Sequence, residues 1–258
     1  MIELIFIFII GTSIGSFLNV VIYRTEKGIS IINPPSFCPE CKSKIKWYDN
    51  IPIISYIILK GRCRNCLNKI SIQYPLIEFI TGFITLVIFL KWGKSNLVWF
   101  LFFSAISYLL ILISAIDFKT MMLSDLFSYL LVFSGMASSF SNPIFEGSNL
   151  IKLRESFSGI LTGAAIIYLI MKIGKIIYKK DAIGEGDIFL LGAIGSFVGG
   201  YGIIDVLIIA SFIGALYGVS LMFLQKLNRF SYIPFGPFLA IGSFLKVYFN
   251  IKVFNIFS

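Results

Sequence analysis

Two aspartates stand next to long apolar stretches of the chain, and their type and position make them the first candidates for chemistry. Asp187 lies between a glycine-containing turn and an apolar run, in the segment AIGEGDIFLLGAI at 182–194. Asp117 ends another apolar run, Tyr108–Ile116. An ionised carboxylate at the mouth of an apolar helix is costly, so such a residue is a functional candidate by default. The sequence therefore predicts that Asp117 and Asp187 form a catalytic pair.

A pair of carboxyl groups can hydrolyse a peptide bond without histidine or a hydrolytic metal. Two carboxylates held close together cannot both ionise, so one acts as base on water and the other as acid toward the carbonyl oxygen. The two titrate as a unit, so neither role is assigned to one residue. The chain contains no histidine, which excludes Ser-His, Cys-His and HExxH catalysis and Cys2His2 zinc sites. A Ser–Lys dyad stays open as an alternative, although no serine and lysine share an evident buried site.

Simpler interpretations exist for the residues around this pair. Asp187 can instead be the N-cap of the helix that follows it, and Asp125, a third candidate, is interpreted as such an N-cap. Gly184 and Gly186 are interpreted as substrate-site backbone, because glycine allows close approach and unusual backbone angles. Glu78 lies one turn into an apolar run and needs a partner, such as an arginine of the preceding loop.

The composition indicates a polytopic membrane protein. Of the 258 residues, 57% are hydrophobic, and the mean hydropathy is +0.91, whereas soluble domains are about 45–50% apolar. The net charge is +9. In a soluble protein this charge would suggest a nucleic-acid partner, but here membrane lipids are the expected partner and nucleic acid is not.

Eight apolar runs are predicted to cross the membrane as helices, which makes the fold class all-α. A crossing needs roughly 20 residues, and most runs are near that length. The first lacks a basic start and a cleavage site, so it is expected to be a retained helix rather than a cleaved signal. The runs are Met1–Ile22, Tyr74–Leu90, Leu97–Ile116, Leu126–Phe140, Phe157–Tyr178, Ile188–Val198, Ile203–Leu224 and Ile233–Phe249.

These runs divide the chain into three predicted domains: a first transmembrane helix at 1–22, a cytoplasmic tetra-cysteine domain at 23–73, and a seven-helix membrane domain at 74–258 that carries the aspartates. With the first loop inside, sixteen of the 22 Lys and Arg residues fall in the cytoplasm, among them Lys179, Lys180, Lys226 and Arg229. The positive-inside rule favours this orientation. It places both aspartates at the cytoplasmic face.

Small residues recur at four-residue spacing in two of the predicted spans. Gly11 and Gly15 lie in the first, and Gly214 and Gly218 lie in the seventh. Such pairs let helix backbones approach closely in a membrane. We expect tight packing at these positions rather than a ligand site.

All four cysteines of the chain lie in two CxxC pairs separated by residues 42–62: Cys38, Cys41, Cys63 and Cys66. Each pair can place two thiolates on one tetrahedral ion, so zinc is the expected ligand. Two disulfides are the first alternative, which a reducing cytosol disfavours. An iron–sulfur cluster is the second, because four thiolates alone do not exclude it. Without a histidine base, a catalytic cysteine is not expected.

These motifs together resemble the bacterial type IV prepilin peptidases, which are GxGD-type aspartyl proteases. The GxGD motif of Gly184, Gly186 and Asp187 alone would be weak evidence for this family. Together with the two CxxC pairs and the motif Gly15–Arg24 in the first span, it is specific. Two positions depart from the family pattern: Ser124 replaces the usual proline, and Phe189 the usual lysine. The match covers nearly the whole chain in order: Gly15–Arg24, the two CxxC pairs, Trp47, Asn50–Pro52, Tyr74, Pro75, Glu78, Asp117, Gly184, Gly186, Asp187 and Pro234–Pro237.

The resemblance implies that the residues at 117 and 187 are the catalytic aspartates. It implies an enzyme of the bacterial inner membrane that cuts the short basic leader from prepilins or pseudopilins, the subunits of type IV pili and type II secretion, at the cytoplasmic face. It also implies N-methylation of the new N-terminus with S-adenosylmethionine, an activity linked to the cysteine-bearing half. No GxGxxG follows a strand pattern, so the residues themselves do not indicate where S-adenosylmethionine binds.

Two other functions compete with this interpretation. The first is a methyltransferase whose aspartates are structural. The second is a transporter or channel in which the acidic residues bind a cation, which predicts acidic residues near the bilayer midplane. The sequence places the two aspartates at the ends of apolar runs instead. It specifies neither which prepilins are cut nor the oligomeric state.

Overall fold

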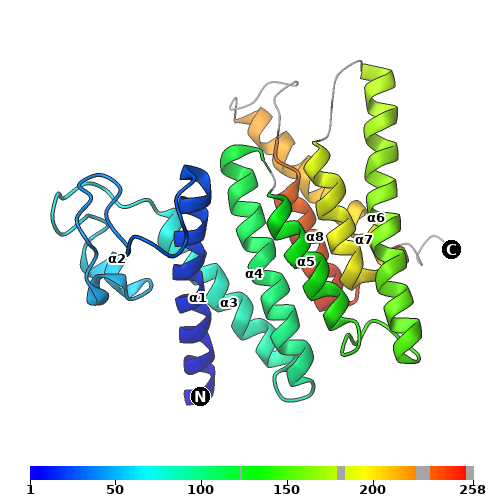
Figure 1. Ribbon diagram of the computed structural model, residues 1–258, viewed down its shortest axis with the longest axis horizontal. Helices are drawn as coiled ribbons and strands as arrows, with labels where there is room; N and C mark the ends of the chain where they lie inside the picture. The colour runs from blue at the N-terminus through cyan, green and yellow to red at the C-terminus, as the bar shows by residue number, and fades with distance from the viewer. Residues whose placement is uncertain (123, 179–183, 225–232, 254–258) are drawn as a thin grey trace. The chain divides into compact units, whose positions relative to one another are not determined.

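Apolar runs of helical length dominate the chain, and a computed structural model shows that they fold as helices (Figure 1). The structure describes residues 1–122, 124–178, 184–224 and 233–253. Within these residues there is no named strand, and only two isolated bridges occur. Four basic residues used in the orientation argument, Lys179, Lys180, Lys226 and Arg229, lie outside the described residues. The chain divides into two units, Met1–Phe100 and Leu101–Ser258.

The first unit is built on two long helices, α1 (Ile2–Lys27) and α3 (Gln73–Trp92). Helix α1 ends at Gly28, which takes the left-handed conformation (φ 64°) common after helix C-termini. The polar segment between α1 and α3 contains the 3-10 turn η1 (Trp47–Asn50) and the short helix α2 (Ile54–Ile58). The two long helices hold this segment at both of its ends.

Glycines bring α1 and α3 into close contact. A Cβ on Gly11 would lie 2.5 Å from Oγ1 of Thr85, and a Cβ on Gly15 would lie 2.7 Å from Cα of Glu78. Neither position therefore has room for a side chain. The predicted packing role of this glycine pair is confirmed.

The second unit contains the rest of the helices. They are α4 (Leu97–Thr120), which begins just before the unit boundary, α5 (Asp125–Ser138), α6 (Asn149–Tyr178), α7 (Glu185–Phe223) and α8 (Gly236–Phe249). The second unit has no long polar segment between described helices comparable to the one between α1 and α3.

Helix α7 is two helical arms joined at Gly199, whose angles (φ 77°, ψ 171°) are non-helical. A straight helix would place residues 187 and 217 about 45 Å apart. Both arms reach the same end of α4. A Cβ on Gly236 would lie 2.6 Å from Oδ2 of Asp117 and 3.4 Å from Cδ2 of Leu190, which is one turn from residue 187, and the rings of Phe118 and Tyr217 are 6.4 Å apart. The chain therefore reverses at Gly199, and the first arm (185–198) and second arm (200–223) correspond to two separately predicted apolar runs.

Backbone contacts position the first arm. Gly195 packs on Gly159 of α6, where a Cβ on either residue would overlap the carbonyl oxygen of the other. One turn away, a Cβ on Gly163 would lie 2.5 Å from the carbonyl oxygen of Leu191. Glycine is required where helices approach this closely, and the contact places the N-terminus of α7 firmly within the unit.

Among the residues that the structure describes, five helices are long and apolar enough to cross a membrane: α1, α3, α4, α6 and α7. Helices α5 and α8 are apolar but shorter, with 14 residues each. An all-α chain with several candidate spans is thus confirmed among the described residues. Eight crossings are not, because length and composition support five helices and one of these is bent into two arms.

Candidate active site

Asp117 lies in the last turn of α4 and is buried, with 5% of its surface exposed. Its Oδ2 accepts a hydrogen bond of 3.0 Å from the backbone N–H of Gly236, the first residue of α8. The first N–H groups of a helix have no partner within the helix. The carboxylate of Asp117 therefore caps α8 from a helix 119 residues away in sequence.

Asp187 is the third residue of α7 and is also buried, with 9% exposed. The N-cap of this helix is Gly184, and the backbone N–H of Asp187 donates to the Gly184 carbonyl at 3.1 Å. The interpretation of Asp187 as an N-cap is therefore wrong, because the helix begins two residues earlier, at Glu185. Its carboxylate is left for another role.

Gly236 brings the two aspartates together. A Cβ on Gly236 would lie 2.6 Å from Oδ2 of Asp117 and 3.4 Å from Cδ2 of Leu190. Leu190 follows Asp187 by three residues and so shares its helix face. The two aspartates, seventy positions apart, thus meet where the end of α4 and the starts of α7 and α8 converge.

Another buried carboxylate of the unit has a different environment. Oδ2 of Asp205, on the second arm of α7, lies 2.5 Å from Nζ of Lys246 on α8, and both side chains are buried. That ammonium also donates to the carbonyl of Ile251. Within the described residues no cation forms an ion pair with Asp117 or Asp187. Asp205 has the neutralising partner of a structural carboxylate, and no cation of the described residues plays that part for the other two.

The glycines before Asp187 keep space open rather than supplying an unusual angle. Gly184 is extended (φ −72°, ψ 147°), a conformation that any residue adopts, so the expectation of unusual backbone angles is wrong there. A Cβ on Gly184 would lie 3.7 Å from Oδ2 of Asp187. Gly186 is the second residue of α7. Both stand beside the carboxylate, as a substrate-site backbone would.

Asp125 does not cap α5. It is the first residue of that helix, and the N-cap is Ser124, which is extended (φ −84°, ψ 120°) and makes no side-chain cap bond. The prediction of Asp125 as N-cap is wrong by one position, because the chain leaves the extended conformation only after Ser124. Asp125 is exposed.

Gly236 is the residue of this site that the sequence did not single out. Sequence reasoning placed it only within the motif Pro234–Pro237. A glycine before a proline, at the start of an apolar run, is a signal for a helix N-terminus with free N–H groups. Its neighbours in the chain do not indicate that its N–H donates to Asp117.

The cysteines form a second candidate site, made of two loops with one shared geometry. In each loop the residue after the second cysteine has a positive φ, 58° at Lys42 and 60° at Leu67. A short bridge flanks each loop, Phe37 with Lys44 and Arg62 with Lys69. The repeated backbone bonds are Cys38 N to Ser43 O, 2.9 Å; Lys42 N to Cys38 O, 2.9 Å; Cys63 N to Asn68 O, 2.9 Å; and Leu67 N to Cys63 O, 3.0 Å.

The four sulfurs can bind a metal ion such as zinc. They lie within 4.8 Å of one another, and Sγ of Cys38 and Cys66 are 3.9 Å apart. A tetrahedral Zn²⁺ with bonds of about 2.3 Å requires sulfurs roughly 3.8 Å apart. All four cysteines are free, so the disulfide alternative is not what the structure contains. The donor set and its spacing fit the expected ion.

Hydrogen bonds lower the pKa of two of the thiols and so favour the thiolate form. A hydrogen bond from Ser43 lowers the pKa of Cys41 to about 6. Backbone N–H groups, that of Cys66 first, lower the pKa of Cys63. At Cys66 the backbone hydrogen bond from Asn68 is outweighed by desolvation and the other sulfurs, which raise its pKa to about 11. Thiolates are the metal-binding form, so an ion would complete the deprotonation of this cluster.

Glu78 has a backbone partner, not the expected arginine. Its Oε2 accepts a hydrogen bond of 2.7 Å from the N–H of Ile53, and the side chain is 7% exposed. Ile53 has φ 62°, which is strained for a β-branched residue. The carboxylate therefore fixes the start of α2 against α3 in a conformation that the loop would not adopt alone.

Two family models match the chain. The bacterial peptidase A24 N-terminal domain matches residues 9–92, and the type IV leader peptidase family matches residues 104–219. The type 4 prepilin-like proteins leader peptide-processing enzyme of Escherichia coli O78:H11 (strain H10407 / ETEC) is 34% identical over 92% of this chain and 91% of its own length. The chain belongs to the type IV leader peptidase family. It is therefore a peptidase.

Other members of the family carry a second activity in their names. The prepilin leader peptidase/N-methyltransferase of Pectobacterium carotovorum subsp. carotovorum is 31% identical over 94% of this chain and 91% of its own length. The enzyme of the same name from Aeromonas salmonicida (strain A449) is 28% identical over 93% of this chain and 89% of its own length. The match to the type IV leader peptidase family contains Asp117 and Asp187, and the match to the N-terminal domain contains the four cysteines. No solved structure matches the chain.

Proposed function

We propose that this protein cuts the leader peptide from type IV prepilins or pseudopilins, with Asp117 and Asp187 as its catalytic residues. The observation that carries the proposal is the meeting of two buried carboxyl groups, from different helices, with no cation among the described residues to neutralise them. The names of the relatives supply the substrate class.

The arrangement suits hydrolysis by a shared proton. One carboxylate takes a proton from a water molecule, whose oxygen attacks the scissile carbonyl carbon, and the other carboxyl group protonates the carbonyl oxygen. The C–N bond then breaks, and the leaving nitrogen takes a proton from the pair. The N–H of Gly236 holds Oδ2 of Asp117, which fixes that carboxyl group toward the water between the two aspartates.

The position of the pair supports cleavage at a membrane face. Asp117 lies in the last turn of α4 and Asp187 in the first turn of α7, so both lie at helix ends rather than midway along a span. A cation transporter would place its acidic residues near the midplane. We place the pair at the cytoplasmic face of the bacterial inner membrane, with eight crossings and with the three domains 1–22, 23–73 and 74–258.

The cysteine-bearing unit has its own role in this proposal. The four cysteines would hold a zinc ion, which would keep the polar segment between α1 and α3 folded. The same enzyme then methylates the new N-terminus of the cut substrate. When bound, S-adenosylmethionine would supply the methyl group for the free amine, which would lose one proton, and its sulfonium would leave as the neutral thioether.

The test is mass spectrometry of a prepilin co-expressed with Asp117→Asn or Asp187→Asn, which reports cleavage and methylation together. Asparagine keeps an oxygen that can accept the Gly236 N–H, so the fold is retained while the acid–base chemistry is lost. We expect cleavage to fall on the order of a thousandfold or more in each variant. Asp125→Asn, an exposed aspartate outside the pair, is the matched control and retains cleavage.

The alternatives give different spectra. Full cleavage in either pair variant would exclude the aspartate mechanism. Uncut but methylated substrate in the wild type would instead identify a methyltransferase with structural aspartates. Cut but unmethylated substrate would leave the peptidase assignment intact and remove the methylation step.

A further inference from the structure

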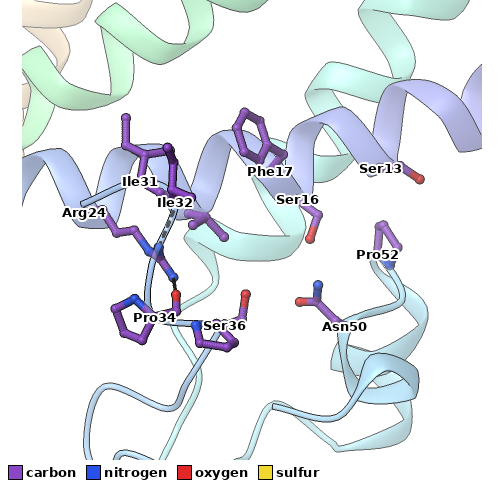
Figure 2. Close-up of a pocket in the computed structure, with 12 residues that line it drawn as sticks. Ser13, Ser16, Phe17, Arg24, Ile31, Ile32, Pro34, Ser36, Asn50 and Pro52 are labelled. Atoms are coloured by element: carbon purple, nitrogen blue, oxygen red, sulfur yellow. Dashed lines mark hydrogen bonds between the residues drawn. The ribbon is translucent and has the colours of Figure 1, made fainter. Parts of the chain in front are cut away.

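A cavity of about 360 Å³ lies between α1 and the polar segment that follows it, within the first unit (Figure 2). One wall is the face of α1 that carries Ser16 and Phe17, and the opposite wall is formed by Asn50 and Pro52. Figure 2 shows Ser16 pointing from α1 into the space that Asn50 borders. Ligand sites for small molecules begin at about this size and combine apolar walls with few polar groups.

One end of the cavity is cationic. Arg24, on α1, is 3% exposed, and its guanidinium donates to the carbonyls of Ser30 and Ile31 at 2.9 Å and of Pro34 at 2.5 Å. Figure 2 shows the bonds to Ile31 and Pro34 on the side of the cavity away from Ser13 and Pro52. Carbonyl groups satisfy the N–H donors but do not neutralise the charge. Within the described residues no carboxylate forms an ion pair with Arg24.

The other end is backed by a carboxylate. Glu78 of α3 accepts the N–H of Ile53, the neighbour of Pro52 in the cavity wall, and Ser16 lies beside the same carboxylate. The cavity therefore has a guanidinium at one end and a carboxylate behind the other, with apolar side chains between them. This is the charge pattern for a zwitterionic ligand with an apolar portion.

We propose that this cavity binds S-adenosylmethionine, an inference that depends on the methyl transfer in the proposed function. The residues fit the ligand. Arg24 attracts its carboxylate, Ser16 and Asn50 supply hydrogen bonds for its hydroxyl groups, and the apolar walls cover its adenine. Its sulfonium, which two methylene groups separate from the carbon that carries the carboxylate, lies toward the end backed by Glu78.

The cysteine cluster is linked to this cavity through one ion pair. Arg64, inside the second CxxC pair, donates from Nε to both oxygens of Asp49 at 3.1 and 2.9 Å and from Nη2 to Oδ1 at 2.6 Å. Asp49 is the neighbour of Asn50 in η1. A metal on the cysteines thus positions one wall of the cavity without contacting the ligand. This linkage gives the metal site a role in binding the methyl donor. It explains why a peptidase has a metal site that is remote in sequence from its aspartates.

The test is calorimetric binding of S-adenosylmethionine and S-adenosylhomocysteine to the full chain in detergent. Ser13→Phe fills the mouth of the cavity and should weaken both affinities at least about tenfold. Ser95→Phe is its matched control: like Ser13, Ser95 is exposed and donates its hydroxyl to the carbonyl four residues earlier, but it does not line the cavity. The control should bind like the wild type.

Arg24 provides the second pair of variants. Arg24→Gln should weaken binding about tenfold, and Arg24→Lys should restore part of it, because lysine keeps the charge without the fork of donors. Leader cleavage should stay within about twofold of the wild type in Ser13→Phe. Photo-crosslinking with radiolabelled S-adenosylmethionine should label peptides from 13–36 or 50–52, and this readout does not depend on any variant folding.

The outcomes separate the two hypotheses. If the wild type binds neither compound and methylates no substrate, the methyl-transfer part of the proposed function fails, and the inference fails with it. If the wild type binds but Ser13→Phe binds equally well, or the cross-link lies elsewhere, the cavity assignment alone is overturned. A phospholipid retained by the wild type and lost from Ser13→Phe, with unchanged affinity for both compounds, would overturn it in favour of a lipid site.

Discussion

The two units of this protein hold their functional residues in different ways. In the second unit, helices carry the aspartates directly, and glycine contacts such as Gly159 with Gly195 fix the helices backbone against backbone. In the first unit, a long polar segment carries the cysteines and the cavity wall. Side-chain bonds from Arg24, Arg64 and Glu78 hold that segment.

The difference follows from what surrounds each site. A membrane interior offers no hydrophobic gain for helix association. Close packing at small residues must therefore supply the free energy of association. A loop outside the apolar layer can use ions, hydrogen bonds and a metal, because water does not need to be excluded from all of it. We therefore expect the peptidase site to fail through steric changes and the methyl-donor site to fail through loss of polar contacts or metal.

The largest expected effect is in the helix packing of the second unit. Gly195→Ala places a methyl group on the backbone of Gly159, which cannot move aside cheaply. We expect a loss of about 3 kcal/mol in unfolding free energy, and cleavage lost with it. Gly192→Ala, on the same helix, meets only ordinary contacts of 3.4 Å and longer and is the matched control. Equal melting temperatures for the two variants would contradict this packing.

The next effect is local to the aspartates. Gly236→Ala would place its Cβ 2.6 Å from Oδ2 of Asp117, so the carboxylate must move and lose the N–H that holds it. We expect cleavage to fall about 100-fold, the scale of a small misplacement at a reacting centre. Gly184→Ala, where the contact with Asp187 is 3.7 Å, should change cleavage much less. Initial rates on a purified prepilin, with unchanged S-adenosylhomocysteine affinity, provide the measurement.

Metal removal should distinguish the functions of the two units, because it should affect methyl-donor binding and not cleavage. A chelator, or the double change Cys63→Ser and Cys66→Ser, should release zinc and weaken S-adenosylhomocysteine binding about tenfold, because η1 is no longer fixed. Cleavage should stay within about twofold, since both aspartates are held by helices of the other unit. Zinc restored after chelation should recover the affinity. A parallel loss of cleavage would show that the units do not act separately.

The smallest effect concerns the ion pair between Arg64 and Asp49, which joins the second CxxC pair to η1. The hydrogen bonds from Arg64 lower the pKa of Asp49, so their contribution is complete above the ordinary pKa of about 3.9 and is lost as the pH falls through the lowered value. Asp49→Asn should weaken S-adenosylhomocysteine binding about threefold at most. The difference from wild type should be the same at pH 7 and pH 5, and a difference that disappears by pH 5 would contradict the lowered pKa.

Local patterns in the sequence predicted the helices well. The predicted run Leu97–Ile116 lies within α4, and Phe157–Tyr178 lies within α6. The two CxxC pairs predicted one cluster, and their sulfurs do lie together. These features depend on residue type and on neighbours a few positions away, which a sequence records directly.

Capping and partner assignments were less predictable. Asp125 was expected to cap α5, yet the chain turns one residue earlier, and Glu78 was expected to bind an arginine but binds the N–H of Ile53. Helix ends shift by a residue for small differences in backbone energy. A buried carboxylate takes whichever donor the folded loop presents.

The sequence by itself determined that the chain forms apolar helices and that four cysteines share a site, and it predicted Asp117 and Asp187 as the carboxylates suited to hydrolysis without histidine. Only the tertiary structure decided that α7 reverses at Gly199 and that the N–H of Gly236 reaches Asp117 across 119 residues. Residue types and short spacings encode the first group. The second depends on which helix surfaces pack together, and that packing follows from contacts between segments that no local pattern connects.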